Sequence, residues 1–139
     1  MDAGLSWSEI KEGQGIPDLR MTVSKLRMMM YAAATWNPYR LHWDSEYCKD
    51  NGFPEANIAG PMFGAYLTEM LTRWAGLSHV KSLEYRNRGM GFPGDTLICR
   101  GKVRRKYEEG RERLADCQVW VENQTGSILA EGSAVVGSI

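Results

Sequence analysis

Residues 60–76 read GPMFGAYLTEMLTRWAG, and this stretch predicts the element around which the rest of the chain folds. Proline is favoured at the first position of a helix and glycine just past its end, so Pro61 and Gly76 mark the bounds of a helix. Between them, six apolar side chains recur at the spacing that places them on one helical face: Phe63, Tyr66, Leu67, Met70, Leu71 and Trp74. The stretch therefore predicts a long helix with one apolar face to bury.

The chain after Gly76 is rich in β-branched and aromatic residues, which are typical of strands. With one more strand ahead of the helices, we expect five, over residues 19–23, 80–87, 96–107, 111–122 and 127–137. Short segments of turn residues separate the last four, at 91–95, 108–110 and 123–126. Connections this short predict antiparallel neighbours in a meander. Because the sheet and the helix each have a face to bury, the sequence predicts an α+β fold in which one curved antiparallel sheet covers the long helix.

Two shorter helices are expected ahead of the long one. Ser24 is a typical N-cap for a helix over residues 25–34. Its apolar face is predicted to consist of Leu26, Met29, Met30 and Ala33. The Met28–Met30 run is expected in the core rather than in a ligand pocket, because methionine fills irregular interiors. Residues 44–49 predict another brief helix, which the breaker sequence at residues 51–54 ends.

Length and charge limit the possible partners. A chain of 139 residues fits one domain, which we expect to span residues 1–139. Seventeen basic residues balance seventeen acidic ones, so no global field attracts the protein to nucleic acid or to an anionic membrane. The one basic run, over residues 100–106, is followed by Glu108, Glu109 and Glu112. We therefore interpret it as a solvated hairpin rather than as a site for the phosphates of coenzyme A.

The N-terminus and the cysteines indicate a cellular setting. The first residues lack the basic start and apolar run of a secretory signal, and no stretch approaches the roughly 18 apolar residues of a membrane span. We therefore expect a cytoplasmic protein without a membrane partner. Cys48, Cys99 and Cys117 have neither CxxC spacing nor Cys/His ligand spacing, which predicts reduced structural thiols and no metal site. No cofactor is expected.

The densest cluster of reactive side chains lies in residues 35–44, which read TWNPYRLHWD. This segment follows one expected helix and precedes another, and loops on rigid scaffolds are common places for binding and catalysis. His42 is one of two histidines, and it has polar neighbours within a few residues, whereas His79 has none. Imidazole exchanges protons near neutral pH, so His42 is the candidate acid and base.

Three blocks of this sequence resemble the MaoC-like hydratases of the hot-dog fold, a family that includes (R)-specific enoyl-CoA hydratases and dehydratases. Their signature has an acidic residue, Asn-Pro, a histidine five positions after the acid, and then aspartate; Asn37, His42 and Asp44 stand at those spacings. A subgroup that includes mesaconyl-CoA-type hydratases has asparagine at the acid position, as here. Residues 58–62 are similar to the segment that opens the central hot-dog helix. Residues 92–97 are similar to the Phe-Pro-Gly-Asp turn ahead of a long strand.

The resemblance implies an enzyme of fatty acid metabolism that adds water reversibly to a 2-enoyl-CoA and gives a (3R)-3-hydroxyacyl-CoA. We expect His42 to exchange protons, Asn37 to position the water, and the backbone N–H of Gly60, at the polarised start of the long helix, to face the thioester oxygen. Five further residues are expected to contact the substrate: Tyr39, Arg40, Ala59, Pro61 and Met62. The resemblance also implies a homodimer, or a heteromer with a second MaoC-like chain of the kind found in steroid side-chain breakdown.

Two departures from the family pattern leave alternatives open. Asn37 cannot transfer a proton at neutral pH, and Ala59 stands where many relatives have histidine. The chain is then either an active hydratase or a non-catalytic subunit of a heteromer. A third alternative is a hot-dog thioesterase that uses Glu69, the one carboxylate well inside the long helix.

The individual residues also have structural alternatives. His42 is either catalytic or a structural histidine, and Asn37 could form a turn with its own backbone. Gly60 is either the oxyanion donor or a plain break ahead of the helix. Arg40 either contacts the substrate or pairs with Asp44.

Overall fold

The predicted long helix is present as α3, Gly60–Ala75, in a computed structural model that describes residues 5–137. Pro61 lies in its first turn, and Gly76 ends the helix with a φ of 92°, a left-handed value that glycine adopts at little cost. Of the six predicted apolar residues, Trp74 is partly exposed and the other five are buried: Phe63, Tyr66, Leu67, Met70 and Leu71. The predicted end at Gly76 is confirmed, and the helix begins at Gly60, one residue ahead of the predicted first position at Pro61.

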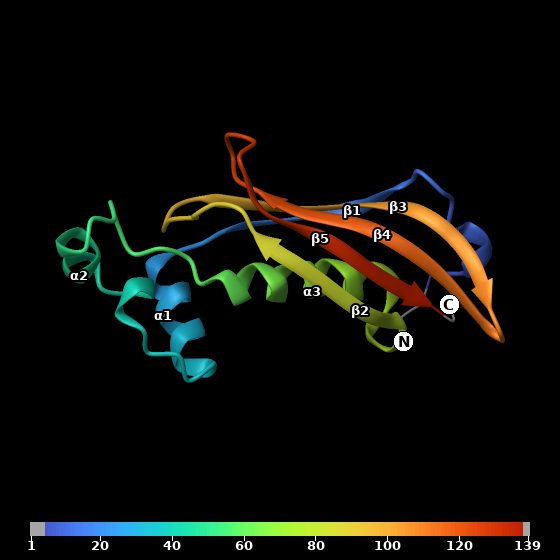
Figure 1. The fold of residues 1–139 in the computed structure, drawn as a ribbon, viewed down its shortest axis with the longest axis horizontal. Coiled ribbons are helices and arrows are strands. Elements are labelled where there is room, and N and C mark those ends of the chain that lie inside the picture. The colour runs from blue at the N-terminus through green and yellow to red at the C-terminus, as the bar shows by residue number, and fades with distance from the viewer. Residues whose placement is uncertain (1–4, 138–139) are drawn as a thin grey trace.

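Five antiparallel strands form one curved sheet, and α3 lies along its concave face (Figure 1). They are β1 (Gly15–Thr22), β2 (Val80–Asn87), β3 (Thr96–Glu109), β4 (Glu112–Glu122) and β5 (Ile128–Gly137), in the spatial order β1-β3-β4-β5-β2. Alternate strand residues such as Leu97, Val103 and Val119 are fully buried and form the core together with α3. The predicted α+β hot-dog architecture is therefore confirmed.

One predicted strand pairing is wrong. The short break at residues 91–95 predicted β2 and β3 as neighbours, but β2 pairs with β5 at the opposite edge, while β3 pairs with β1 and β4. The connection from β2 to β3 is too long for a tight hairpin, because it also includes residues 88–90. The N–H groups of Arg88 and Gly89 donate to the carbonyl oxygen of Leu129, at 2.8 and 3.2 Å. This connection thus follows β5 before it reaches β3.

Two short helices lie beyond one end of the sheet, α1 (Lys25–Ala34) and α2 (Ser45–Asp50) (Figure 1). The Ser24 side chain accepts a hydrogen bond from the N–H of Arg27 at 3.1 Å, so the predicted N-cap is confirmed. Asp44 caps α2 by accepting from the N–H of Tyr47 at 3.0 Å.

The predicted apolar face of α1 points away from the core. Met28 and Ala32 are buried instead, whereas Leu26, Met29 and Met30 are 67%, 47% and 63% exposed. Because α1 lies beyond the end of the sheet, only one narrow stripe of the helix reaches the core. Of the methionine run, only Met28 belongs to the core, and α1 presents an uncovered apolar surface.

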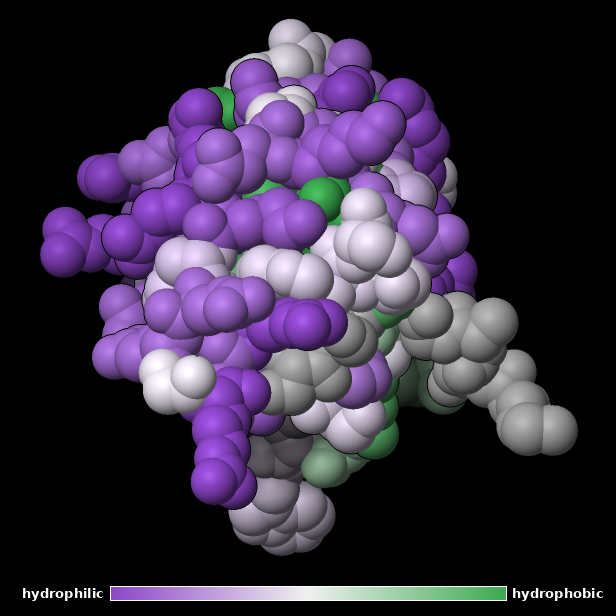
Figure 2. All heavy atoms as spheres, turned by 90° about the vertical axis from the view of Figure 1, so that its right-hand side faces the viewer, coloured by the Kyte–Doolittle hydropathy of each residue, from purple (hydrophilic) through white to green (hydrophobic). Residues whose placement is uncertain are grey.

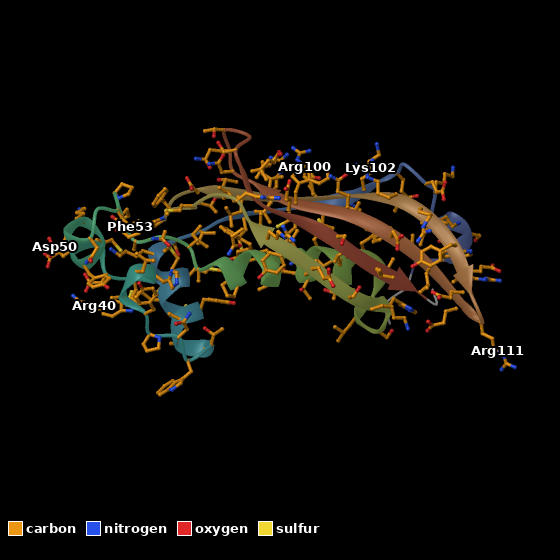
Figure 3. The ribbon with its side chains drawn as sticks, viewed as in Figure 1. Arg40, Asp50, Phe53, Arg100, Lys102 and Arg111 are labelled. Atoms are coloured by element: carbon orange, nitrogen blue, oxygen red, sulfur yellow. The ribbon has the colours of Figure 1, made fainter. Side chains whose placement is uncertain are left out.

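The basic run lies in a solvated hairpin, as predicted. Arg100 and Lys102 stand on the face of the sheet opposite α3, and Arg111 is at the tip of the β3–β4 hairpin (Figure 3). Arg100 pairs with Glu122 at 2.8 Å and with Asp18 at 3.4 Å. Hydrophilic side chains predominate at the end of the molecule that carries the tip of the β3–β4 hairpin, which is the end farthest from α1 and α2 (Figure 2).

All three cysteines are free and buried. Burial raises the pKa of Cys99 and of Cys117 to about 12, and it is also the main cause of the raised pKa of Cys48. The thiols therefore keep their protons at neutral pH and are inert, as structural cysteines are. Across residues 5–137, no cluster of His, Cys, Asp and Glu side chains could hold a metal ion, and no helix has the length and apolarity to cross a bilayer.

Candidate active site

The site begins where α1 ends in a tight reversal. The N–H of Thr35 donates to the carbonyl oxygen of Tyr31, and the N–H of Asn37 donates to that of Ala32, both at 2.9 Å. Between them, Trp36 has a φ of 52° and is the one non-glycine residue with positive φ in the described part of the chain. A left-handed conformation costs an ordinary residue roughly 1–2 kcal/mol. The reversal thus ties the backbone of Asn37 to the last turn of α1.

His42 ends a single 3-10 turn, Arg40–His42, and one hydrogen bond holds its ring to the segment that leads into α3. Its Nδ1 lies 2.9 Å from the carbonyl oxygen of Asn57, and the N–H of Asn57 donates to the carbonyl oxygen of Leu41 at 3.0 Å. A carbonyl can only accept, so Nδ1 must carry the proton of this bond. In the neutral ring, Nε2 then keeps its lone pair and is the available base.

Asn37 and His42 line one cavity with Ala59 and Met62 from the start of α3. Met28, Tyr31 and Ala32 of α1 complete its walls. The first loop and the opening turn of the central helix therefore converge, as the sequence predicted. In the single chain, the cavity is too narrow for a water-sized sphere.

Gly60 adjoins this cavity as the first residue of α3. Ala59, the N-cap, has no side chain that could satisfy the first N–H groups of the helix, and Pro61 has no N–H. Within residues 5–137, the N–H of Gly60 donates to no protein acceptor. A Cβ added to Gly60 would lie 2.1 Å from Nδ2 of Asn87, so the side-chain amide of Asn87 stands directly against this glycine.

The structure does not bring every predicted residue to the cavity. The Tyr39 ring meets the His42 ring edge-on, with the centroids 5.6 Å apart, so it contacts the base. Pro61 is exposed and does not line the cavity. Arg40, labelled in Figure 3, pairs with Asp44 through Nε and Nη2 at 2.9 and 2.8 Å, which is the alternative that the sequence left open. Its guanidinium also lies over the ring of Tyr47.

Three residues that the sequence analysis did not single out belong to this site. Tyr31 lines the cavity, Asn57 holds the His42 ring, and Asn87 contacts Gly60. Burial raises the pKa of the Tyr31 phenol, with further contributions from Tyr85 and Tyr66, so the phenol stays protonated at neutral pH. The spacing of Met28, Tyr31 and Ala32 places them on one helical face, and this pattern could have predicted Tyr31. No pattern in the nearby sequence indicates the roles of Asn57 and Asn87.

The Asp44 carboxylate provides a pH test of this loop. Its hydrogen bonds from the N–H of Tyr47, first, and from Arg40 hold its pKa below the usual value. Such a carboxyl stabilises the fold above its unfolded-state pKa of about 4, and the contribution is lost as the pH falls through the lowered folded-state pKa. Asp44→Asn keeps an N-cap but removes the charge. We expect wild type to unfold at higher urea concentration than the variant at pH 7, and the two midpoints to converge below about pH 4. A difference between the two urea midpoints that stays the same at every pH would contradict this role.

Comparisons with known proteins identify the family. A family model described as "Hydroxyacyl-thioester dehydratase type 2" matches residues 8–93, more than half of the chain. The chain belongs to this family. It is 31% identical over 80 residues to the mitochondrial hydroxyacyl-thioester dehydratase type 2 of Saccharomyces cerevisiae. That match covers 56% of this chain and 28% of the yeast protein, so the chain spans less than a third of this curated relative.

Solved structures of MaoC-like proteins share the fold. R-hydratase PhaJ1 from Pseudomonas aeruginosa, unliganded, superposes with a TM-score of 0.87 and 19% identity over 96% of this chain and 84% of that one. A MaoC-like dehydratase from Rhodospirillum rubrum superposes with a TM-score of 0.84 and 19% identity over 98% of this chain and 97% of that one. A chain of the ChsH1–ChsH2 complex from Mycobacterium tuberculosis superposes with a TM-score of 0.81 and 20% identity over 93% of this chain and 98% of that one. The resemblance to MaoC-like hot-dog proteins is thus confirmed. A cytoplasmic location stays a prediction, since the name of the yeast relative places that protein in mitochondria.

Proposed function

We propose that this hydroxyacyl-thioester dehydratase family member adds water reversibly to a 2-enoyl-CoA and gives a (3R)-3-hydroxyacyl-CoA. The observation that carries the proposal is the convergence of Asn37 and His42 with the start of α3 around one cavity. The free Nε2 of His42 supports the same reaction, because hydration needs a base that can later act as an acid. The family and the R-hydratase fold agree with it.

The reaction divides into two proton transfers around one anionic intermediate. Asn37 orients a water, and Nε2 of His42 takes a proton from it as the water oxygen bonds to C3 of the alkene. The electron pair of the double bond moves through C2 onto the thioester oxygen, which the N–H of Gly60 stabilises. The imidazolium then returns its proton to C2. Both new bonds form on one face, so the addition is syn, and the family resemblance implies the (3R) product.

Hydrolysis of the thioester has less support. A thioesterase would need a carboxylate beside the substrate, and Glu69 is the candidate on α3. Its carboxylate pairs with Arg73 at 2.5 Å, and Glu69 does not line the cavity. We therefore favour hydration over hydrolysis.

A non-catalytic subunit of a heteromeric hydratase is the second candidate. One observation and two features of the family resemblance favour it. The cavity is too narrow for water in the single chain. In the family pattern that the sequence resembles, Asn37 stands at the acid position and Ala59 at a position that is histidine in many members. The similarity to the ChsH1–ChsH2 complex adds support. In this case a second MaoC-like chain supplies the acid and opens the site.

An assay on the purified chain separates the candidates. Hydration removes the absorbance of the enoyl thioester, and chiral analysis of the product identifies (3R) or (3S). Hydrolysis releases a free thiol instead. We expect the first signal with a (3R) product. If neither signal appears until a co-purifying MaoC-like chain is added, the subunit candidate replaces the proposal.

A further inference from the structure

An apolar groove of about 380 Å³ lies next to the candidate active site. Its walls come from the exposed side of α1 and from the loop that follows: Met29, Ala32, Ala33, Trp36, Pro38 and Trp43. Two indole N–H groups are the hydrogen-bond donors among these side chains: that of Trp43 donates to the carbonyl oxygen of Pro38 at 3.0 Å, and Trp36 carries the other on a side chain that is 89% exposed. The walls of the groove are therefore almost entirely apolar, and its volume falls in the usual range of small-molecule sites, roughly 300–1,000 Å³.

The groove adjoins the cavity that holds His42. Ala32 lines both of them. Along the loop, Trp36 and Pro38 line the groove, whereas Asn37 between them lines the cavity. We therefore expect a substrate that occupies the cavity to reach the groove across the small Ala32 side chain, which is the wall that the two share.

Trp36 is held in this position at a cost to the fold. It is 89% exposed, and its positive φ is one that glycine would adopt more easily. A strained and exposed tryptophan buries little apolar surface in the fold, and its place at the rim of the groove indicates a role in binding. The contrast with the hydrophilic opposite end of the molecule (Figure 2) agrees with a local function.

We propose that this groove binds the acyl chain of the substrate, and that the chain therefore selects thioesters with medium or long apolar acyl groups over short or polar ones. This inference rests on the proposed function for the orientation of the substrate, with its thioester at His42. Binding of saturated acyl-CoAs, which cannot react, tests the groove separately from catalysis.

The experiment measures the dissociation constants of butanoyl-, octanoyl- and decanoyl-CoA by calorimetry. For wild type, we expect the affinity to rise by about twofold per methylene, because a half-buried methylene contributes about half the transfer free energy of a fully buried one. Ala33→Trp fills the groove without touching the cavity and is expected to abolish this gain. Ala34→Trp adds the same bulk at an exposed neighbour that does not line the groove, and should leave the gain unchanged.

Trp36→Gly is the second variant. It removes one wall of the groove and relieves the positive φ, so we expect the thermal midpoint not to fall while the gain per methylene is lost. A reduced gain at unchanged stability separates binding from folding.

The outcomes decide between the two proposals. Affinities that do not depend on acyl length, or that Ala33→Trp and Ala34→Trp change equally, would overturn the groove and leave the proposed function intact. A length dependence without hydration of any enoyl-CoA would support the groove and reject the proposed function. If Ala33→Trp alone dissociates an oligomer in sedimentation velocity and wild type shows no length dependence, the groove is a subunit contact.

Discussion

Replacing His42 with alanine is expected to lower kcat for hydration of a 2-enoyl-CoA by roughly 10²–10⁴, the contribution of a positioned acid and base. The ring is the one imidazole at the cavity, and its bond to the carbonyl oxygen of Asn57 leaves Nε2 free for the proton of the water. Steady-state kinetics from the loss of enoyl absorbance measure the change. We expect KM to change much less, because the ring acts on the reacting atoms rather than on the rest of the substrate.

The second histidine provides a matched control. Nδ1 of His79 lies 3.1 Å from the carbonyl oxygen of Gly137, so both rings are bonded to a backbone carbonyl, but His79 does not line the cavity. His79→Ala should therefore leave kcat nearly unchanged. Added imidazole should partly restore His42→Ala, because the deletion leaves room for it. Equal kcat values for wild type and His42→Ala would exclude the mechanism.

Gly60→Pro is expected to lower kcat by roughly 10²–10³ relative to Gly60→Ala, the usual effect of removing one oxyanion donor. Proline removes the N–H, whereas alanine keeps it, and both add a Cβ on the side of Asn87. Proline is tolerated at the first helical position, and Ala59 already has a ψ of 132°, which suits a residue ahead of proline. The comparison therefore isolates the amide proton.

The Gly60→Pro and Gly60→Ala variants distinguish an oxyanion donor from a structural role of Gly60. Asn87 is exposed, so its side chain can rotate away from the new Cβ, and both variants should unfold at similar urea concentrations. Similar kcat values for the folded proline and alanine variants would show that Gly60 is only a structural break ahead of α3. In that case the thioester oxygen finds its donor elsewhere.

Local patterns predicted most of the elements. The bounds of α3 followed from Pro61 and Gly76, because their preferences depend on the backbone next to them. The family blocks placed Asn37, His42 and Ala59 correctly around one cavity, since motifs preserve spacing between parts of a site.

Long-range packing was not predictable in the same way. The alternation within β2 is compatible with pairing to β3 or to β5, and the choice depends on the path of residues 88–95 across the sheet. The helix α1 has two apolar stripes, and only its position beyond the sheet decides that Met28 is buried and Met29 is not. Asn57 and Asn87 act through contacts with residues 15 and 27 positions away, which no local pattern records.

The buried cysteines have a practical consequence for measuring coenzyme A release. A disulfide dye reacts with thiolates that it can reach, and Cys48, Cys99 and Cys117 are all buried, with raised pKa values. The folded protein should therefore add no colour of its own, even at high enzyme concentration. Slow colour development in a blank without substrate would instead report opening of the core, so the same reagent also monitors the integrity of each variant.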